Sequence, residues 1–151
     1  MSADPNSLVL QASAVAIDGR ALLIEGPPGL GKSSLALALI ERGAQLIGDD
    51  GVTVRAHENR ASLIASPPPN IEGLLEVRGV GLVAVQTAEP APVALILTLL
   101  RPEQSNSERL PDAAPKRDIL GCQIPALPFR PGDIAPAQRA LVALKVHGLV
   151  P

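Results

Sequence analysis

Residues 26–33 have the sequence GPPGLGKS and match G-x-x-x-x-G-K-[ST], the pattern of a phosphate-binding loop. The five residues before this phosphate loop, ALLIE, are typical of a short buried strand. Residues 33–42 have the apolar spacing of a helix, with Leu35, Leu39 and Ile40 on one stripe. A strand, a glycine loop and a helix in this order surround a phosphate with backbone N–H groups and the positive end of the helix dipole. The stretch therefore predicts an α/β fold built around a phosphate site.

Within the phosphate loop, Lys32 is expected to hold the β- and γ-phosphates, and the Ser33 hydroxyl is expected to bind Mg²⁺. Pro27 and Pro28 have no backbone N–H, so the amides from Gly29 onward must hold the phosphates. The predicted nucleotide-binding residues are Gly26, Pro27, Pro28, Gly29, Leu30, Gly31, Lys32, Ser33 and Ser34.

The composition fits one domain, which we place at residues 8–151 behind a flexible N-terminus at residues 1–7. The chain has 151 residues, 46% of them hydrophobic, which is enough for one core. Phe129 is the one aromatic residue, so an adenine ring would lie against aliphatic groups or bind loosely.

Charge and cysteine content exclude several classes of protein. The net charge of −2 gives no support to a nucleic-acid partner. The single Cys122 forms no internal disulfide and is expected to be a small core thiol, as in a cytoplasmic protein. The sequence shows neither a signal peptide nor a segment apolar enough to span a membrane. We therefore expect a cytoplasmic protein with no membrane partner.

The chain also predicts a series of strands and a second helix. Residues 8–17 are expected to form one strand, joined by an Asp18-Gly19 hairpin turn to an antiparallel strand at 21–25. Residues 102–117 are expected to be a loop, and Leu141, Leu144 and Val142 are expected to face inward from the last helix. The other expected strands are 44–48, 52–55, 61–65, 82–85, 93–100 and one within 119–127, and the last helix is 136–146.

Acidic and basic residues outside the phosphate loop are candidates for catalysis. Asp49 and Asp50 follow the strand at 44–48, where carboxylates could serve a metal or activate a nucleophile, although Asp-Asp-Gly is also a common solvated turn. Glu76 and Arg78 share one face of a strand and form either part of a site or a surface ion pair. Arg109 is either directed at a phosphate or solvated.

These pieces together resemble the catalytic domain of HPr kinase/phosphorylase, from about Leu10 to the C-terminus. The resemblance rests on GPPGLGKSS, LIGDD, LLEVRGVGLV, RLP at 109–111 and RPG at 130–132, in the order the family has them. The family phosphorylates a serine of HPr, the phosphocarrier protein of the sugar phosphotransferase system, and removes that phosphate by phosphorolysis. The resemblance implies a mixed sheet like that of the phosphoenolpyruvate carboxykinase nucleotide domain.

The resemblance also implies roles and partners. Residues 26–34 would bind ATP, and Ser33 and Glu76 would hold Mg²⁺. One residue of the Asp49/Asp50 pair would be the general base; we favour Asp50, but the sequence leaves the choice open. The arginines assigned to catalysis are Arg78, Arg109 and Arg130. The implied partners are HPr and further copies of the same chain, often six in the family.

The chain departs from the family at two positions linked to phosphate handling. Gln11 stands where the family has an active-site histidine, and Gln cannot carry a proton as His can. Asp133 replaces the second arginine of the family's R-P-G-R-N turn. The sequence therefore favours phosphorylation over phosphorolysis, in a short form of the family without its N-terminal regulatory domain.

Two other classes of protein share some of these features. The loop sequence also occurs in AAA-type ATPases, although the chain is short for such a domain with its helical lid. A nucleotide-binding sensor without turnover, acting with a two-component signalling partner, would also keep the phosphate loop. ATP binding without phosphate transfer to any protein would favour the sensor.

Overall fold

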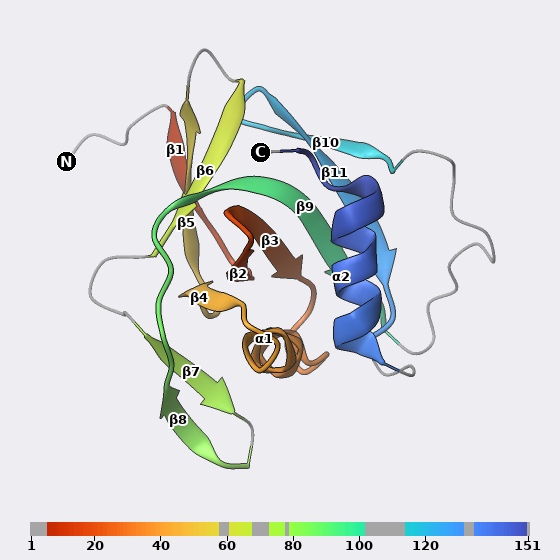
Figure 1. Ribbon diagram of the computed structural model, residues 1–151. Helices are drawn as coiled ribbons and strands as arrows, with labels where there is room; N and C mark the ends of the chain where they lie inside the picture. Colours follow the sequence, from red (N-terminus) through yellow and green to blue (C-terminus); the bar gives the residue numbers. More distant parts are fainter. Residues whose placement is uncertain are drawn as a thin grey trace.

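The computed structural model describes residues 6–57, 61–67, 73–77, 79–101, 114–131 and 135–150. Two helices and a curled mixed sheet make up most of this part of the chain, and a small hairpin stands apart (Figure 1). The elements are β1 (Ser7–Leu10), β2 (Ser13–Ile17), β3 (Arg20–Glu25), α1 (Lys32–Ile40), β4 (Gln45–Gly48), β5 (Val52–His57), β6 (Ser62–Ser66), β7 (Leu74–Val77), β8 (Gly81–Ala84), β9 (Ala91–Leu99), β10 (Lys116–Ile119), β11 (Cys122–Phe129) and α2 (Pro136–His147).

The large sheet has the strand order β1-β5-β6-β9-β3-β2-β4, and β11 joins it beside β9 with β10 at its edge. Strands β3 and β11 run parallel to β9, whereas the other pairings are antiparallel. The predicted mixed α/β fold is therefore confirmed. The carboxyl ends of β3, β9 and β11 meet at one edge, and the phosphate loop begins there, at the end of β3.

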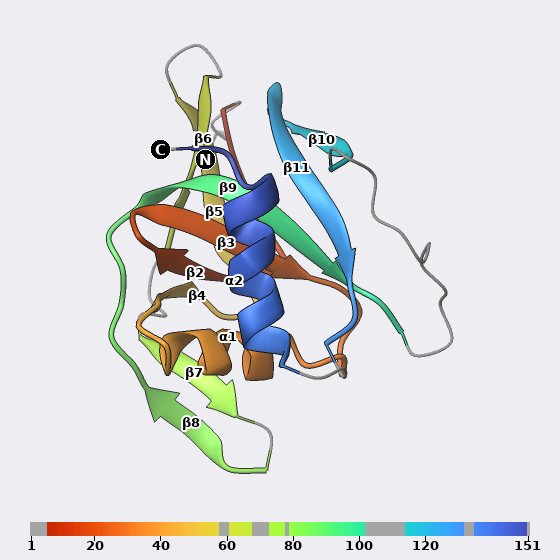
Figure 2. The same ribbon diagram turned by 45° about the vertical axis from the view of Figure 1, so that its right-hand side comes forward.

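The core lies on both faces of the central strands. Leu22 and Ile24 of β3 pack under the two helices, and Ala21 and Leu23 pack on the opposite face. Figure 2 shows α1 and α2 on the same side of β3 and β9. The buried aliphatic side chains thus form two apolar layers, one on each face of β3. These layers fix the position of β3 and of the loop that follows it.

Several sequence predictions about elements are confirmed. The turn at Asp18-Gly19 joins β2 to β3 with φ of 51° and 78°, which suits a type I′ hairpin. Cys122 is buried, and Leu35 and Leu39 of α1 are buried as expected, whereas Ile40 is half-buried. In the described residues, neither helix has the length and apolar character needed to cross a bilayer.

The expected single strand at 8–17 is wrong, because it is divided between β1 and β2. The chain bends at Gln11, where the Ala12 amide donates to the Leu10 carbonyl over 3.0 Å. Strand β1 then pairs with β5, whereas β2 pairs with β3 and β4. The sheet also begins earlier than residue 8, since Ser7 already pairs with Arg55.

Two further expectations are corrected at the C-terminal end. Of the loop expected at 102–117, residues 116 and 117 belong instead to β10, because Leu120 and Gly121 take positive φ and turn the chain back into β11. Residues 102–113 lie outside the described residues. Val142 of α2 is 59% exposed, because α2 packs on the sheet through Ala137, Ala140 and Leu144.

Strands β7 and β8 form a separate hairpin below α1 (Figure 1). Leu75 is fully buried in the core under the helices and attaches this hairpin to the rest of the molecule. The hairpin brings Glu76 to the phosphate loop, although β7 shares no ladder with the large sheet.

Candidate active site

The phosphate loop leaves β3 at Glu25 and enters α1 at Lys32. Gly26 has φ of 148°, and a Cβ there would lie 3.1 Å from the Leu99 Cβ and 3.2 Å from the Leu99 carbonyl oxygen. A side chain at this position would therefore be crowded against β9. Gly31 precedes α1 in the left-handed region with φ of 96°. Both glycines allow the tight path that this kind of loop requires.

Lys32 bends back across the loop from the first turn of α1. Its Nζ donates to the Gly26 carbonyl over 2.7 Å and lies 3.4 Å from the Pro27 carbonyl oxygen. This places a positive charge at the mouth of the loop, where it can meet the phosphates of a nucleotide.

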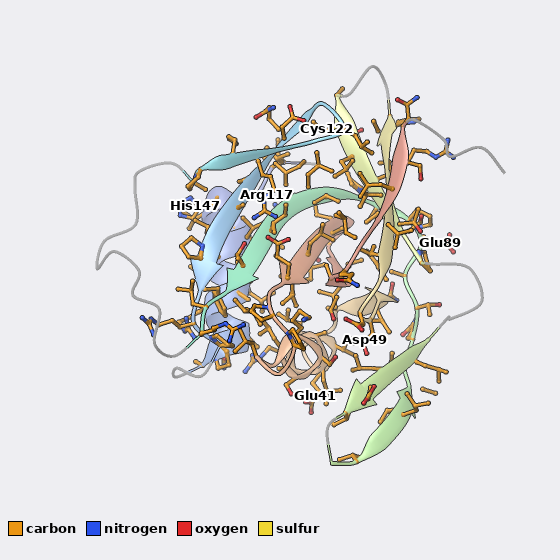
Figure 3. All side chains as sticks on the ribbon, turned by 180° about the vertical axis from the view of Figure 1, so that it is seen from behind. Glu41, Asp49, Glu89, Arg117, Cys122 and His147 are labelled. Carbon is orange, nitrogen blue, oxygen red and sulfur yellow. The ribbon has the colours of Figure 1, made fainter. Side chains whose placement is uncertain are left out.

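Asp49 joins four parts of the fold through its carboxylate. Its Oδ1 accepts hydrogen bonds from the Ser33 hydroxyl at 2.6 Å and from the Ser13 hydroxyl at 2.9 Å. Its Oδ2 accepts one from the Glu76 amide at 3.0 Å. Asp49 follows β4 and lies between α1 and the β7–β8 hairpin in Figure 3. The side chain of Asp49 therefore joins the end of β4 to β2, α1 and β7 at one point.

Asp50 has a different environment from its neighbour. The residue is exposed and takes φ of 59°, in the left-handed region that few non-glycine residues adopt. It lines the same cavity of about 460 Å³ as Asp49. The residues that line this cavity are Pro28, Gly29, Leu30, Gly31, Lys32, Ser33, Ser34, Asp49, Asp50 and Glu76.

The structure thus brings together most of the residues that the sequence singled out. Arg130 is an exception, because it lies at the end of β11 and is not among the residues that line the cavity. Its carbonyl accepts a hydrogen bond of 2.6 Å from Arg139, whose guanidinium lies 4.6 Å from the centre of the Phe129 ring. Arg78 and Arg109 lie outside the described residues, as does Asp133. Gln11 is exposed at the bend between β1 and β2.

Sequence reasoning missed two groups of residues that support the site without lining its cavity. Ser13 is one, and its signal was a lone polar residue in the otherwise apolar run SAVAI. The other group is an ion pair between Glu25 and Arg117, in which the Glu25 carboxylate also accepts a hydrogen bond of 2.9 Å from Thr98. Arg117 in turn lies 3.3 Å from the Thr98 hydroxyl, beside β9 (Figure 3). The sequence signal for this group was a charged residue at the end of the apolar strand β3.

The donor set of the cavity suits Mg²⁺. In the part of the chain that the structure describes, no three His, Cys, Asp or Glu side chains are gathered into a metal cluster. Mg²⁺, however, commonly uses one or two carboxylates together with the phosphates of its substrate. The Ser33 hydroxyl and the carboxylates of Asp49, Asp50 and Glu76 are hard oxygen donors around one cavity. These residues therefore fit a metal ion that arrives with a nucleotide.

The fold and the cavity define an α/β phosphate-loop protein with a pair of aspartates beside the loop. The sequence model of the HPr Serine kinase C-terminal domain matches residues 6–137, and the chain belongs to this family.

Individual relatives agree with this assignment. The chain is 37% identical over 128 residues to an HPr kinase/phosphorylase of Bacillus mycoides (strain KBAB4), covering 78% of this chain and 41% of that protein. It is 38% identical over 129 residues to one of Geobacillus kaustophilus (strain HTA426), with the same coverage. The chain thus spans about two fifths of the length of these curated relatives.

A solved structure has a similar fold. The Hpr(Ser) kinase/phosphatase from Coxiella burnetii superposes with a TM-score of 0.79 at 29% sequence identity. The match covers 91% of this chain and 95% of that one, so the curled sheet is similar over nearly the whole domain.

Proposed function

We propose that this chain, as a catalytic domain over about residues 8–151, transfers the γ-phosphoryl group of ATP to a serine of HPr. The observation that carries the proposal is the hydrogen bond between Ser33 of the phosphate loop and Asp49, with Asp50 exposed in the same cavity. Membership of the HPr serine kinase family and the names of the relatives support HPr as the acceptor.

The phosphate loop would bind the nucleotide through its amides from Gly29 onward and through Lys32. Mg²⁺, when bound with ATP, would neutralise charge on the phosphates and so assist the departure of ADP from the γ-phosphoryl group. Ser33 and Asp49 would hold the ion in the manner of other phosphate-loop enzymes, and Glu76 would add a carboxylate from β7. In such enzymes catalysis is mostly positioning and electrostatic stabilisation.

Asp50 is the better candidate for the general base. Both oxygens of Asp49 already accept hydrogen bonds from the protein. Asp50 is exposed in the cavity, where the hydroxyl of an incoming serine could reach it. We therefore propose that Asp50 accepts the serine proton and that Asp49 orients the Ser33 hydroxyl.

The transfer step exchanges one P–O bond for another and moves one proton. The serine oxygen bonds to the γ-phosphorus as the bond from that phosphorus to the β,γ-bridging oxygen breaks, so ADP leaves. The serine proton passes to Asp50. Arg78, Arg109 and Arg130 remain candidates for stabilising the transferring group on the strength of the family resemblance.

Phosphorolysis would run the related step with inorganic phosphate as the nucleophile, and Asp50 would return the proton to serine. Gln11 stands where the family has a histidine, and Asp133 stands where it has an arginine. We therefore expect phosphorylation to exceed phosphorolysis. We also expect a homo-oligomer that works in the cytoplasm, where HPr would be available to it.

The test is incubation of the protein with ATP, Mg²⁺ and HPr from the same organism, followed by intact-mass measurement and site mapping. A gain of one phosphate on an HPr serine is the expected result, and Lys32→Ala should abolish it. Inorganic phosphate added afterwards tests reversal in the same tube. ATP binding without transfer would overturn the kinase proposal and favour the sensor with a two-component partner, and ATP hydrolysis without any acceptor would favour an ATPase.

A further inference from the structure

Ser13 is the one buried polar side chain among the described residues, with no exposed surface. A hydroxyl loses its bonds to water when it is buried, so its position is favourable only where the protein supplies replacements. Ser13 has two such contacts, both to the aspartate pair. Its hydroxyl donates to Asp49 over 2.9 Å, and its oxygen lies 3.5 Å from the Asp50 amide nitrogen, which is long for a hydrogen bond.

The direction of these contacts follows from the chemistry of the groups. A serine hydroxyl has one proton to donate, and an ionised carboxylate only accepts. The proton of Ser13 must therefore point at Asp49. The lone pairs of the same oxygen are left to face the amide of Asp50. The Ser13 hydroxyl is thus the donor toward Asp49 and offers its lone pairs as acceptor toward the Asp50 amide.

The backbone around this contact has an unusual conformation. In the pairing of β2 with β4, Ala14 lies opposite Gly48 and Val15 lies opposite Leu46, so Ile47 is an extra residue on β4. Such a bulge bends a strand and re-aims the side chains that follow it. Asp50 then takes φ of 59°, a conformation that persists where the surroundings determine it.

We propose that Ser13 is a positioning residue for this pair, a role that rests on the proposed function. It holds Asp49 on Ser33 and holds the backbone of Asp50 so that the Asp50 carboxylate enters the cavity. Loss of the hydroxyl should therefore slow phosphate transfer more than it weakens nucleotide binding, because the phosphate loop itself remains intact. If Ser13 were simply a small residue that fits its site, alanine would replace it without effect.

The test compares Ser13→Ala with Ser13→Thr, which keeps the hydroxyl and suits a strand. Ser66→Ala is the matched control, since Ser66 lies on β6 and does not line the cavity. We expect Ser13→Ala to lower kcat about tenfold or more, with KM for ATP changed less than about threefold, because small displacements of a base reduce rate strongly. Ser13→Thr should recover most of the rate, and Ser66→Ala should match wild type.

A second readout does not depend on activity. Hydrogen exchange of the Asp50 amide, followed by NMR in the full chain, should speed up about threefold or more in Ser13→Ala if the contact is lost. Should wild type fail to phosphorylate HPr, the proposed function fails, and this exchange measurement alone decides whether Ser13 positions Asp50.

Three results would overturn the positioning role. The first is wild-type kcat and unchanged exchange in Ser13→Ala. The second is an equal loss of kcat in Ser13→Ala and in a folded Ser13→Thr, since the hydroxyl would then not matter. The third is a loss of nucleotide affinity as large as the loss of rate. If Ser13→Thr does not fold, Ser13→Cys replaces it and should fall between alanine and wild type, because a thiol is a weak donor.

Discussion

Asp49 and Asp50 are chemically identical neighbours with different environments. The Asp49 carboxylate accepts hydrogen bonds from two serine hydroxyls and one backbone amide. Asp50 is exposed in the cavity, and its backbone is in the left-handed region. We therefore expect mutation of Asp50 to reduce catalysis and mutation of Asp49 to reduce stability.

Asp50→Asn should lower the rate of phosphate transfer by about 10²- to 10⁴-fold, the range that general bases contribute. Nucleotide affinity should change little, because the phosphate loop and Asp49 are untouched. Steady-state kinetics with HPr, together with calorimetric titration of ATP analogues, would measure the two effects separately. Full activity in Asp50→Asn would remove Asp50 as the base.

Asp49→Ala should destabilise the fold, because it leaves the buried Ser13 hydroxyl without its acceptor. Such a loss costs about 1–3 kcal/mol in the free energy of unfolding. Asp50→Asn, its matched control, should stay within about 0.5 kcal/mol of wild type, because the side chain is exposed and asparagine tolerates the left-handed backbone at this position. Urea unfolding of the two variants makes the comparison, and equal losses would show that the hydrogen bonds to Asp49 contribute little.

At the scale of elements, the phosphate loop is held at its entry by three strands. Glu25 at the end of β3 pairs with Arg117 of β10, and both contact Thr98 of β9. Gly26 then lies against Leu99. The path of the loop into α1 therefore depends on contacts from strands that come about 70 to 90 residues later in the chain.

Arg117→Met should raise KM for ATP by a few fold, because Glu25 loses the partner that orients the start of the loop. The effect on stability should be at most about 1 kcal/mol, since the pair is partly exposed to solvent. Lys116→Met on the same strand is the control, because Lys116 is exposed and contributes nothing to the pair. If both variants have the same KM, the ion pair does not position the loop.

Gly26→Ala should destabilise the protein more than Gly19→Ala. Both glycines have positive φ, so alanine is strained at either position, but a Cβ at Gly26 would meet Leu99 whereas one at Gly19 would meet nothing within 4 Å. We expect the difference to be about 1–3 kcal/mol, as for other overpacked sites. Thermal unfolding of the two variants measures this difference. Equal melting temperatures would show that β9 can shift at Leu99 without a loss of stability.

At the scale of the whole molecule, the curled sheet makes the site by joining distant segments. Strand β2, the end of β4, helix α1 and hairpin β7–β8 all meet at the Asp49 carboxylate (Figure 3). A ligand that binds across this junction should therefore stabilise the entire domain.

ATP with Mg²⁺ should raise the melting temperature of the wild type. A ligand at a concentration 100 times its Kd adds about 2.7 kcal/mol to the free energy of unfolding. Lys32→Ala should show a much smaller shift, because the ammonium group at the mouth of the loop is gone. Thermal scans at increasing ATP concentration make the measurement, and an equal shift in both proteins would place the nucleotide elsewhere.

Sequence alone determined the features whose chemistry is local. The phosphate loop, the turn at Asp18-Gly19 and the helices were predictable because adjacent residues encode them through glycines, turn residues and apolar periodicity. Asp49 and Asp50 were also predictable as candidates, because they follow an apolar strand beside the phosphate loop. The metal-binding role of Glu76 was predicted only from the resemblance to the family.

The tertiary structure decided what depended on partners far along the chain. The division of residues 8–17 into β1 and β2 follows from their pairing with β5 in one case and with β3 and β4 in the other. The distinct environments of Asp49 and Asp50 and the pairing of Glu25 with Arg117 likewise arise from strand register. The side-chain contacts of Asp49 and Glu25 join residues at least 16 positions apart. Local sequence patterns do not encode contacts over such separations, so only the packed sheet determines which of the two neighbouring carboxylates is held by hydrogen bonds and which is exposed in the cavity.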